Sequence, residues 1–177
     1  MTRHVALLRG INVSGKNLIP MPALREAITA AGFTDVSTYI QSGNVIFSTP
    51  DLAEAEIVPR IEQAIAGRFG LSIPTVVRSE AELTRLVAHP PTDVPEGGTL
   101  AVMFLGATPT PEAVARLDPN RSPPDTWEVA GREIVLRCPN GLGRTKLTID
   151  SFERVLGTVA TARNWRSVVT LATLVQG

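Results

Sequence analysis

The segment VSTYIQSGNVIFST, residues 36–49, predicts a β-hairpin and with it the architecture of the first half of the chain. Residues 36–41 and 44–49 are rich in β-branched and aromatic residues, and Ser42-Gly43 between them has the composition of a two-residue turn. An isolated hairpin is barely stable in water, so it needs further strands or a helix to cover one face. The sequence on either side of the hairpin therefore decides the fold class.

Strands and helices alternate on both sides of this hairpin. Residues 5–8 form an apolar run that predicts a buried strand, and Met21-Pro22 opens a helix, since proline is favoured in a first helical turn. The spacing of apolar residues over 57–69 predicts a second helix, and residues 73–77 a returning strand. This order predicts an α+β, ferredoxin-like (βαββαβ-type) half over residues 1–78.

A linking segment is expected at residues 79–98. The stretch SEAEL has the spacing of a capping box, with Ser79 as the cap and Glu82 three residues later, and it predicts a helix to about residue 88. Residues 89–98 are rich in proline and glycine and mark the boundary between two halves.

Residues 99–177 repeat the beginning of the first half. An apolar run at residues 100–106 predicts a strand, and Thr110-Pro111 opens a helix. TWEVA and EIVLRC, within residues 126–138, predict a hairpin around Gly131-Arg132. The recurrence indicates a structural duplication, although the two halves share few identical residues.

The end of the second half is expected to differ from that of the first. Asp150, with Glu153 three residues later, predicts a capped helix, and residues 167–174 are apolar enough for a final helix or strand. The sequence therefore predicts a second ferredoxin-like half that is variant at its carboxyl-terminal end.

The composition limits the classes of function. Seventeen basic residues balance seventeen acidic ones, which argues against a dedicated nucleic-acid binder without excluding contact with nucleic acid. No apolar run approaches the roughly 20 residues of a membrane span, and the start of the chain lacks the pattern of a signal peptide. We therefore expect a cytoplasmic protein without membrane contact, with Cys138 as a buried strand thiol.

The loop GINVSGKN, residues 10–17, fits the phosphate-binding pattern GxxxxGK[ST] except at Asn17, where the pattern has a hydroxyl residue. In that motif the helix begins at the Gly-Lys pair, whereas Pro20 delays the helix here. The spacing therefore argues against a nucleoside triphosphatase. It leaves open an anion held by loop amides together with Lys16 and Arg9.

Two further groups of polar residues are candidates for a site. Gln41, Ser42 and Asn44 either complete the hairpin turn or form the wall of a site. Residues 141–146 and 161–166 supply basic side chains, glycines and a tryptophan suited to phosphates or bases. The alternative for the second group is that Thr161 or Asn164 caps a last helix and Trp165 packs between the halves.

We therefore expect a binding protein for a small anionic ligand, either phosphorylated or nucleotide-like. The candidate binding residues are Arg9, Asn12, Lys16, Asn17, Gln41, Ser42, Asn44, Arg144, Lys146, Arg163, Asn164 and Trp165. The alternatives are a metal-independent transferase-like enzyme that uses the same loops, and a structural or protein-interaction module. No metal-ligand spacing is present, and the sequence specifies neither catalytic residues, nor a cofactor, nor an oligomeric state.

Five stretches resemble one bacterial family, which is known as domain of unknown function 1697 (DUF1697). They are LLRGINVSGKN at residues 7–17, MPALREAI at 21–28, TYIQSGNVIFS at 38–48, GRTKLT at 143–148 and TARNW at 161–165. The resemblance implies a two-part ferredoxin-like α+β fold and no particular activity. Lys16 and Asn17 keep the pattern of that family.

Overall fold

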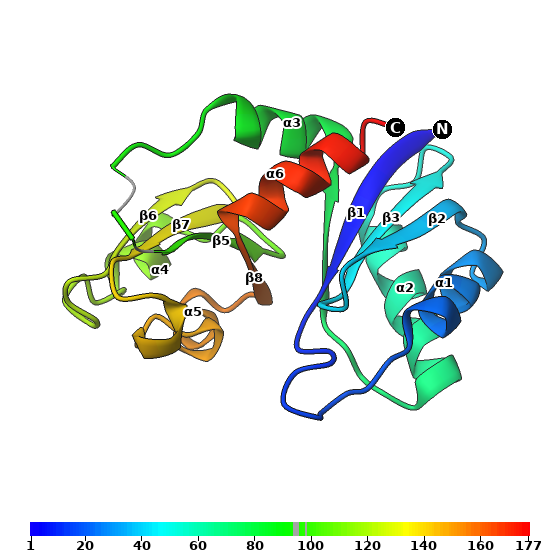
Figure 1. The fold of residues 1–177 in the computed structure, drawn as a ribbon, viewed down its shortest axis with the longest axis horizontal. Helices are drawn as coiled ribbons and strands as arrows, with labels where there is room; N and C mark the ends of the chain where they lie inside the picture. Colours follow the sequence, from blue (N-terminus) through cyan, green and yellow to red (C-terminus); the bar gives the residue numbers. More distant parts are fainter. Residues whose placement is uncertain (94–95, 98) are drawn as a thin grey trace. The chain divides into compact units, whose positions relative to one another are not determined.

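The computed structural model describes residues 1–93, 96–97 and 99–177, and in these residues it is an α+β structure with two four-stranded antiparallel sheets (Figure 1). The chain divides into two compact units. Unit 1 consists of Met1–Ala88 together with Val169–Gly177, and unit 2 consists of His89–Val168. The predicted α+β class is confirmed, whereas the predicted domain boundaries at residues 79–98 stay a prediction.

Unit 1 is a sheet with helices α1 and α2 packed on one face. Its elements are β1 (Thr2–Leu8), α1 (Met21–Ala30), β2 (Thr34–Tyr39), β3 (Asn44–Thr49), α2 (Glu54–Phe69), β4 (Thr75–Ser79) and α3 (Glu80–Ala88). The strand order is β2-β3-β1-β4. Because side chains alternate along a strand, Ala6, Leu8 and Phe47 share one face, and they form the core with Ile28 and Ile61 of the two helices.

Unit 2 repeats this arrangement in the order β6-β7-β5-β8. Its elements are β5 (Thr99–Leu105), α4 (Pro111–Ala115), β6 (Thr126–Ala130), β7 (Glu133–Cys138), the 3-10 helix η1 (Leu142–Arg144), α5 (Ile149–Leu156), β8 (Ala160–Asn164) and the first turn of α6 (Trp165–Leu174). Cys138 is a free, buried thiol in the core of this unit, as expected. The turn Gly131-Arg132 follows the prediction, since Ala130 pairs with Glu133.

The prediction that the second half ends differently is wrong. Strand β8 pairs antiparallel with β5 just as β4 pairs with β1, and each of these last strands runs directly into a helix, α6 or α3. The sequence of β8, ATARN, is short and has little β-propensity, so its extended form depends on the ladder it makes with β5. The two units therefore share the whole order of strands.

The predicted two-residue hairpin turn at Ser42-Gly43 is also wrong. Tyr39 pairs with Asn44, so the turn comprises residues 40–43. The carbonyl of Gly43 accepts a hydrogen bond of 2.8 Å from the amide of Leu8 in β1. The end of the turn is thereby bonded to β1, the strand on the other side of β3.

The helix caps are partly as predicted. Ser79 and Glu82 form the expected capping box of α3, because the Ser79 amide donates to Glu82 Oε2 at 2.8 Å and the Glu82 amide donates to Ser79 Oγ at 3.3 Å. The predicted cap of α5 at Asp150 is wrong. Thr148 is the N-cap, and its hydroxyl accepts from the Ser151 amide at 3.2 Å.

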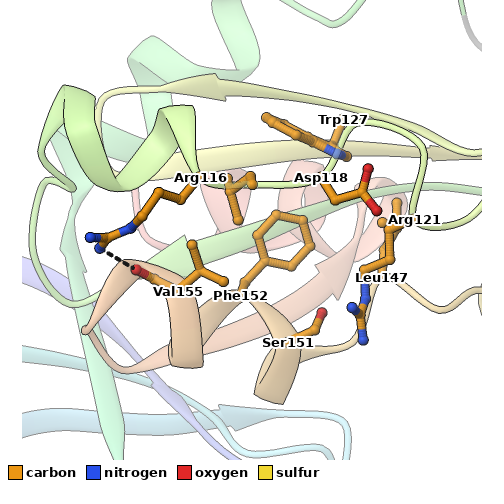
Figure 2. Close-up of a pocket in the computed structure, with 9 residues that line it drawn as sticks. Arg116, Asp118, Arg121, Trp127, Leu147, Ser151, Phe152 and Val155 are labelled. Carbon is orange, nitrogen blue, oxygen red and sulfur yellow. Dashed lines mark hydrogen bonds between the residues drawn. The ribbon is translucent and has the colours of Figure 1, made fainter.

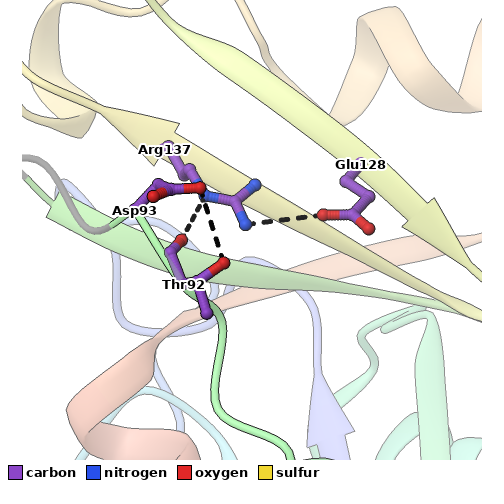
Figure 3. Close-up of polar contacts among 4 residues, drawn as sticks. All are labelled: Thr92, Asp93, Glu128 and Arg137. Atoms are coloured by element: carbon purple, nitrogen blue, oxygen red, sulfur yellow. Dashed lines mark hydrogen bonds and ion pairs between the residues drawn. The ribbon is translucent and has the colours of Figure 1, made fainter.

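The segment before β5 is fixed to the sheet of unit 2 (Figure 3). Arg137 of β7 donates from Nε to the Thr92 carbonyl at 3.0 Å and from Nη2 to Glu128 Oε2 at 3.4 Å.

Among the described residues, no helix is long and apolar enough to cross a membrane.

Candidate functional site

Two segments of unit 1 meet at one end of its sheet. The chain leaves β1 after Leu8 and reaches α1 through residues 9–20, and the turn of residues 40–43 enters β3. The Leu8–Gly43 hydrogen bond and the pairing of Leu7 with Asn44 place the two segments side by side. We name residues 9–20 and 40–43 together the loop surface.

Asn12 connects the two segments of the loop surface. Its Nδ2 donates to the carbonyl of Gln41 at 2.9 Å and to the carbonyl of Ile19 at 3.0 Å. Its Oδ1 accepts from the Ile19 amide at 2.8 Å. A single side chain therefore satisfies three backbone groups, which holds the loop in one conformation.

The tip of the loop is a tight turn from Val13 to Lys16, closed by a hydrogen bond of 2.9 Å from the Lys16 amide to the Val13 carbonyl. Its central residues have positive φ, 50° at Ser14 and 73° at Gly15, as in a type I′ turn. Asn17 also has positive φ, 48°, and its Nδ2 donates to the Gly10 carbonyl at 3.0 Å. The tip is therefore braced from within the loop.

Gly43 is required where the turn approaches β1. A Cβ atom at this position would lie 2.8 Å from Cβ of Leu8 and 3.0 Å from Cγ1 of Ile11. The residue also has a φ of 84°, which favours glycine. Both the space and the backbone conformation exclude a larger residue.

The loop surface exposes apolar side chains beside Lys16, and sequence reasoning missed them. Val13 is 56% exposed, Leu18 67% and Ile40 50%, while Lys16 itself is exposed. The signal was available, because Val13 and Leu18 are apolar residues on either side of the polar run SGKN. Three exposed apolar side chains on one loop surface make it a candidate for binding.

Several predicted site residues of unit 1 have structural roles. Asn44 is fully buried and donates from Nδ2 to the Tyr39 carbonyl at 3.0 Å and to Ser42 Oγ at 3.1 Å. Gln41 is exposed and Arg9 is half-buried. The structure thus supports the turn-forming interpretation of Ser42 and Asn44.

The prediction that the helix starts well after the glycine-lysine pair is confirmed. Helix α1 begins at Met21, after an N-cap at Pro20, and not at Lys16. The helix amides therefore do not face the glycine-lysine turn.

The predicted residues of unit 2 lie at or after the ends of β7 and β8, the two strands that flank β5. Arg144 and Lys146 are exposed on the segment after β7, and Asn164 ends β8. Cys138 pairs with Thr99 and Asn164 pairs with Ala101, so both strands end where β5 begins. The two basic segments thus leave the same end of the sheet.

Asn164 is a helix cap, as the alternative interpretation predicted. Its Oδ1 accepts from the Ser167 amide at 2.8 Å at the start of α6. Trp165, the first residue of that helix, is half-buried.

Arg163 is buried in the sheet rather than exposed on a surface. It donates from Nη1 to the Ala162 carbonyl at 2.8 Å and to Thr161 Oγ1 at 2.9 Å. Burial lowers the pKa of Arg163 to about 10, so the guanidinium is still charged at neutral pH.

The buried arginine recurs in unit 1. Arg78 pairs with Val5 in β1 as Arg163 pairs with Val102 in β5, and Arg78 Nη1 donates to the preceding carbonyl, of Val77, also at 2.8 Å. Arg78 and Arg163 thus occupy equivalent register positions and make the same hydrogen bond to the preceding carbonyl. This recurrence indicates that Arg163 has a structural role in the repeat.

The fold and these surfaces define an α+β protein of two repeated four-stranded units, with a braced loop that presents a lysine in the first. The model of a family described as "Protein of unknown function (DUF1697)" matches residues 1–134, and the chain belongs to this family. The match ends before the two carboxyl-terminal motifs GRTKLT and TARNW.

Comparison with solved structures finds the conserved bacterial protein SP0830 from Streptococcus pneumoniae, with a TM-score of 0.69 and 21% sequence identity over 98% of each chain. At this identity the likeness concerns the fold alone. Comparison with curated proteins finds no match.

Proposed function

We propose that the protein is a binding protein whose loop surface holds a small anionic, nucleotide-like ligand. The observation that carries the proposal is that the loop surface exposes Lys16 together with Val13, Leu18 and Ile40 on a backbone braced by its own hydrogen bonds. A braced loop loses little conformational entropy on binding, which favours affinity.

The side chains of the loop surface match the two parts of a nucleotide. The Lys16 ammonium is a point charge suited to a phosphate, and the apolar side chains of Leu18 and Ile40 are suited to the face of a base. The half-buried Arg9 lies at the start of the same loop and adds positive charge.

The basic segments of unit 2 are retained as a separate candidate surface for an anionic ligand. Arg144 and Lys146 are exposed cations in these segments. Arg163, Asn164 and Trp165 are retained as candidates for contact or for shaping the segment that carries the exposed cations.

The chain has only two lysines, Lys16 and Lys146, which makes a selective test possible. Reductive methylation with ¹³C gives one dimethylamine signal for each lysine and one for the amino terminus, and it keeps the positive charge. We expect ATP to shift the Lys16 signal saturably, and adenosine or inorganic phosphate to shift it less. A shift of the Lys146 signal in the same titration would support the contribution of unit 2.

Two variants complete this test. Lys16→Ala is expected to weaken ATP binding by about tenfold or more, the loss typical of one hydrogen bond to a charged group. Arg154→Ala, which removes an exposed charge of α5 outside the loop surface, serves as the control and should leave binding unchanged. An unshifted Lys16 signal with every probe, or equal losses in both variants, contradicts the proposal.

We also propose that both halves are ferredoxin-like. The strand orders β2-β3-β1-β4 and β6-β7-β5-β8, with a helix after the first strand and another after the hairpin of each half, support this. An experimental structure in which either sheet has a different strand order would contradict it.

A further inference from the structure

Unit 2 contains a pocket of about 170 Å³ between the segment that follows α4, strand β6 and helix α5 (Figure 2). Its apolar wall is formed by Leu117, Trp127, Leu147, Phe152 and Val155. The rings of Trp127 and Phe152 meet edge to face, with centroids 6.0 Å apart and planes at 89°. A cavity of roughly 150 Å³ accepts benzene, so this volume suits one six-membered ring.

Two arginines stand at the rim of the pocket, on opposite sides of the Phe152 ring in Figure 2. Arg116 donates from Nη2 to the Val155 carbonyl at 3.3 Å, and Arg121 donates from Nε to the Lys146 carbonyl at 2.9 Å. Both guanidinium groups are thereby held at the pocket by the protein backbone. Within the described part of the chain, the two η nitrogens of Arg121 have no protein acceptor.

The charge at the rim is positive. Asp118 is the one carboxylate among the residues that line the pocket, and its Oδ1 accepts a hydrogen bond of 2.9 Å from the Asn120 amide. Asp118 thus offsets one of the two guanidinium charges and leaves the other. The hydroxyl of the buried Ser151 donates to the Thr148 carbonyl at 2.7 Å and does not supply a free donor.

From this geometry we propose a second binding site, for a monocyclic aromatic carboxylate whose ring packs against Trp127 and Phe152 and whose carboxylate binds Arg121. The two η nitrogens of Arg121 suit the two oxygens of a carboxylate. The pocket volume of about 170 Å³ is close to that of a cavity that holds one benzene ring. This site lies in unit 2 and does not depend on the proposed function of the loop surface.

The two tryptophans of the chain, Trp127 and Trp165, provide the readout. In ¹⁵N-labelled full-length protein they give two indole N–H signals, which a Trp165→Phe variant assigns. We expect phenylacetate to shift the Trp127 signal saturably. The neutral 2-phenylethanol and the cationic phenethylamine should bind more weakly, because they lack the carboxylate.

Substitutions that change the charge at the rim or the volume of the pocket test the two parts of the proposal, the contact with the carboxylate and the contact with the ring. Arg121→Gln is expected to weaken phenylacetate binding by about tenfold or more, and Arg121→Lys by less, because it keeps the charge. Arg154→Gln, on α5 but outside the pocket, is the matched control and should bind as the wild type does. Val155→Phe should fill the pocket and abolish the shift while the rest of the spectrum is retained.

Several outcomes overturn this assignment. They are an unshifted Trp127 signal at millimolar phenylacetate, equal binding of the three probes, equal losses in the Arg121→Gln and Arg154→Gln variants, and undiminished binding to a folded Val155→Phe protein. Loss of nucleotide binding at Lys16 has no bearing on these results, so failure of one proposal is distinguishable from failure of the other.

Discussion

Asn12 is the residue on which the shape of the loop surface most depends. Replacing it with alanine leaves the amide and carbonyl of Ile19 and the carbonyl of Gln41 without their partner. We expect Asn12→Ala to lower the free energy of unfolding by about 1–3 kcal/mol, since the two Ile19 groups are partly buried. Denaturant titration measures the loss, and hydrogen exchange of the Ile19 amide shows whether it is local.

The matched control at this position is Asn12→Asp, which keeps an oxygen for the Ile19 amide but removes both Nδ2 hydrogen bonds. Ile19 should therefore exchange more slowly in Asn12→Asp than in Asn12→Ala. Unchanged Ile19 exchange in both variants would show that Asn12 does not brace the loop.

His4 makes the stability of unit 1 depend on pH. Burial lowers the pKa of this imidazole below its ordinary value of 6.5, and the ring stacks on Phe47 with centroids 5.7 Å apart. The backbone carbonyl of Thr2 and the charges of Glu82 and Glu54 act in the opposite direction but do not reverse the shift. Between the folded and unfolded pKa values, the unfolded chain binds more protons than the folded chain.

It follows that the contribution of His4 to the free energy of unfolding is fully present above pH 6.5. It is lost as the pH falls through 6.5 toward the lower pKa of the folded state. We expect the free energy of unfolding, measured by denaturant titration, to fall more steeply between pH 7.5 and about pH 5 for the wild type than for His4→Gln. His89→Gln, at the exposed second histidine, is the control. Identical pH profiles for the wild type and His4→Gln would refute the role of His4.

At the scale of the element, Thr148 decides where α5 begins. Its hydroxyl accepts at 3.2 Å from the Ser151 amide, a donor of the first helical turn that also bonds the Thr148 carbonyl at 3.1 Å. Thr148→Ala should lower the free energy of unfolding by about 0.5–2 kcal/mol. Thr148→Ser should retain most of the stabilisation by the cap, because serine is an equally good cap. Thermal or chemical unfolding measures both, and equal losses in the two variants would mean that the hydroxyl is not the stabilising group.

The repeat of strands is also a property of elements. Each half places its first strand in the centre of the sheet, its hairpin on one side and its last strand on the other. The last strand carries a buried arginine in both halves, Arg78 or Arg163, and ends in a residue that caps the next helix, Ser79 or Asn164. The halves differ in the lengths of their connections: residues 9–20 lie between the first strand and the first helix, where the second half has only residues 106–110.

At the scale of the whole molecule, the two ends of the chain both belong to unit 1 (Figure 1). Gln176 Nε2 donates to Thr84 Oγ1 of α3 at 3.3 Å, which connects the carboxyl-terminal segment to that unit. Leu171 of the same segment is 1% exposed.

Leu171→Ala should therefore lower the free energy of unfolding by about 2–5 kcal/mol, the usual cost of removing a buried leucine side chain. Val169→Ala, on the same helix but 41% exposed, should have little effect. Hydrogen exchange is expected to show the loss of protection in β1 and α3. A loss confined to β5–β8 would contradict the assignment of this segment to unit 1.

The sequence by itself determined the features that depend on short stretches of chain. The α+β class, the helix that starts at Met21-Pro22, the capping box of Ser79 and Glu82 and the turn at Gly131-Arg132 all follow from local spacing. The family resemblance was likewise readable from contiguous motifs and is confirmed over residues 1–134.

Only the tertiary structure decided the features that depend on distant partners. Residues 160–164 become a strand because β5 offers them a ladder, and Gly43 at the end of the turn bonds to Leu8 of another strand. Asn12 braces the loop because the Gln41 carbonyl lies beside it in space, although 29 positions away in the sequence. Local patterns specify local conformation, but hydrogen bonds between distant residues form only once the sheet has brought them together.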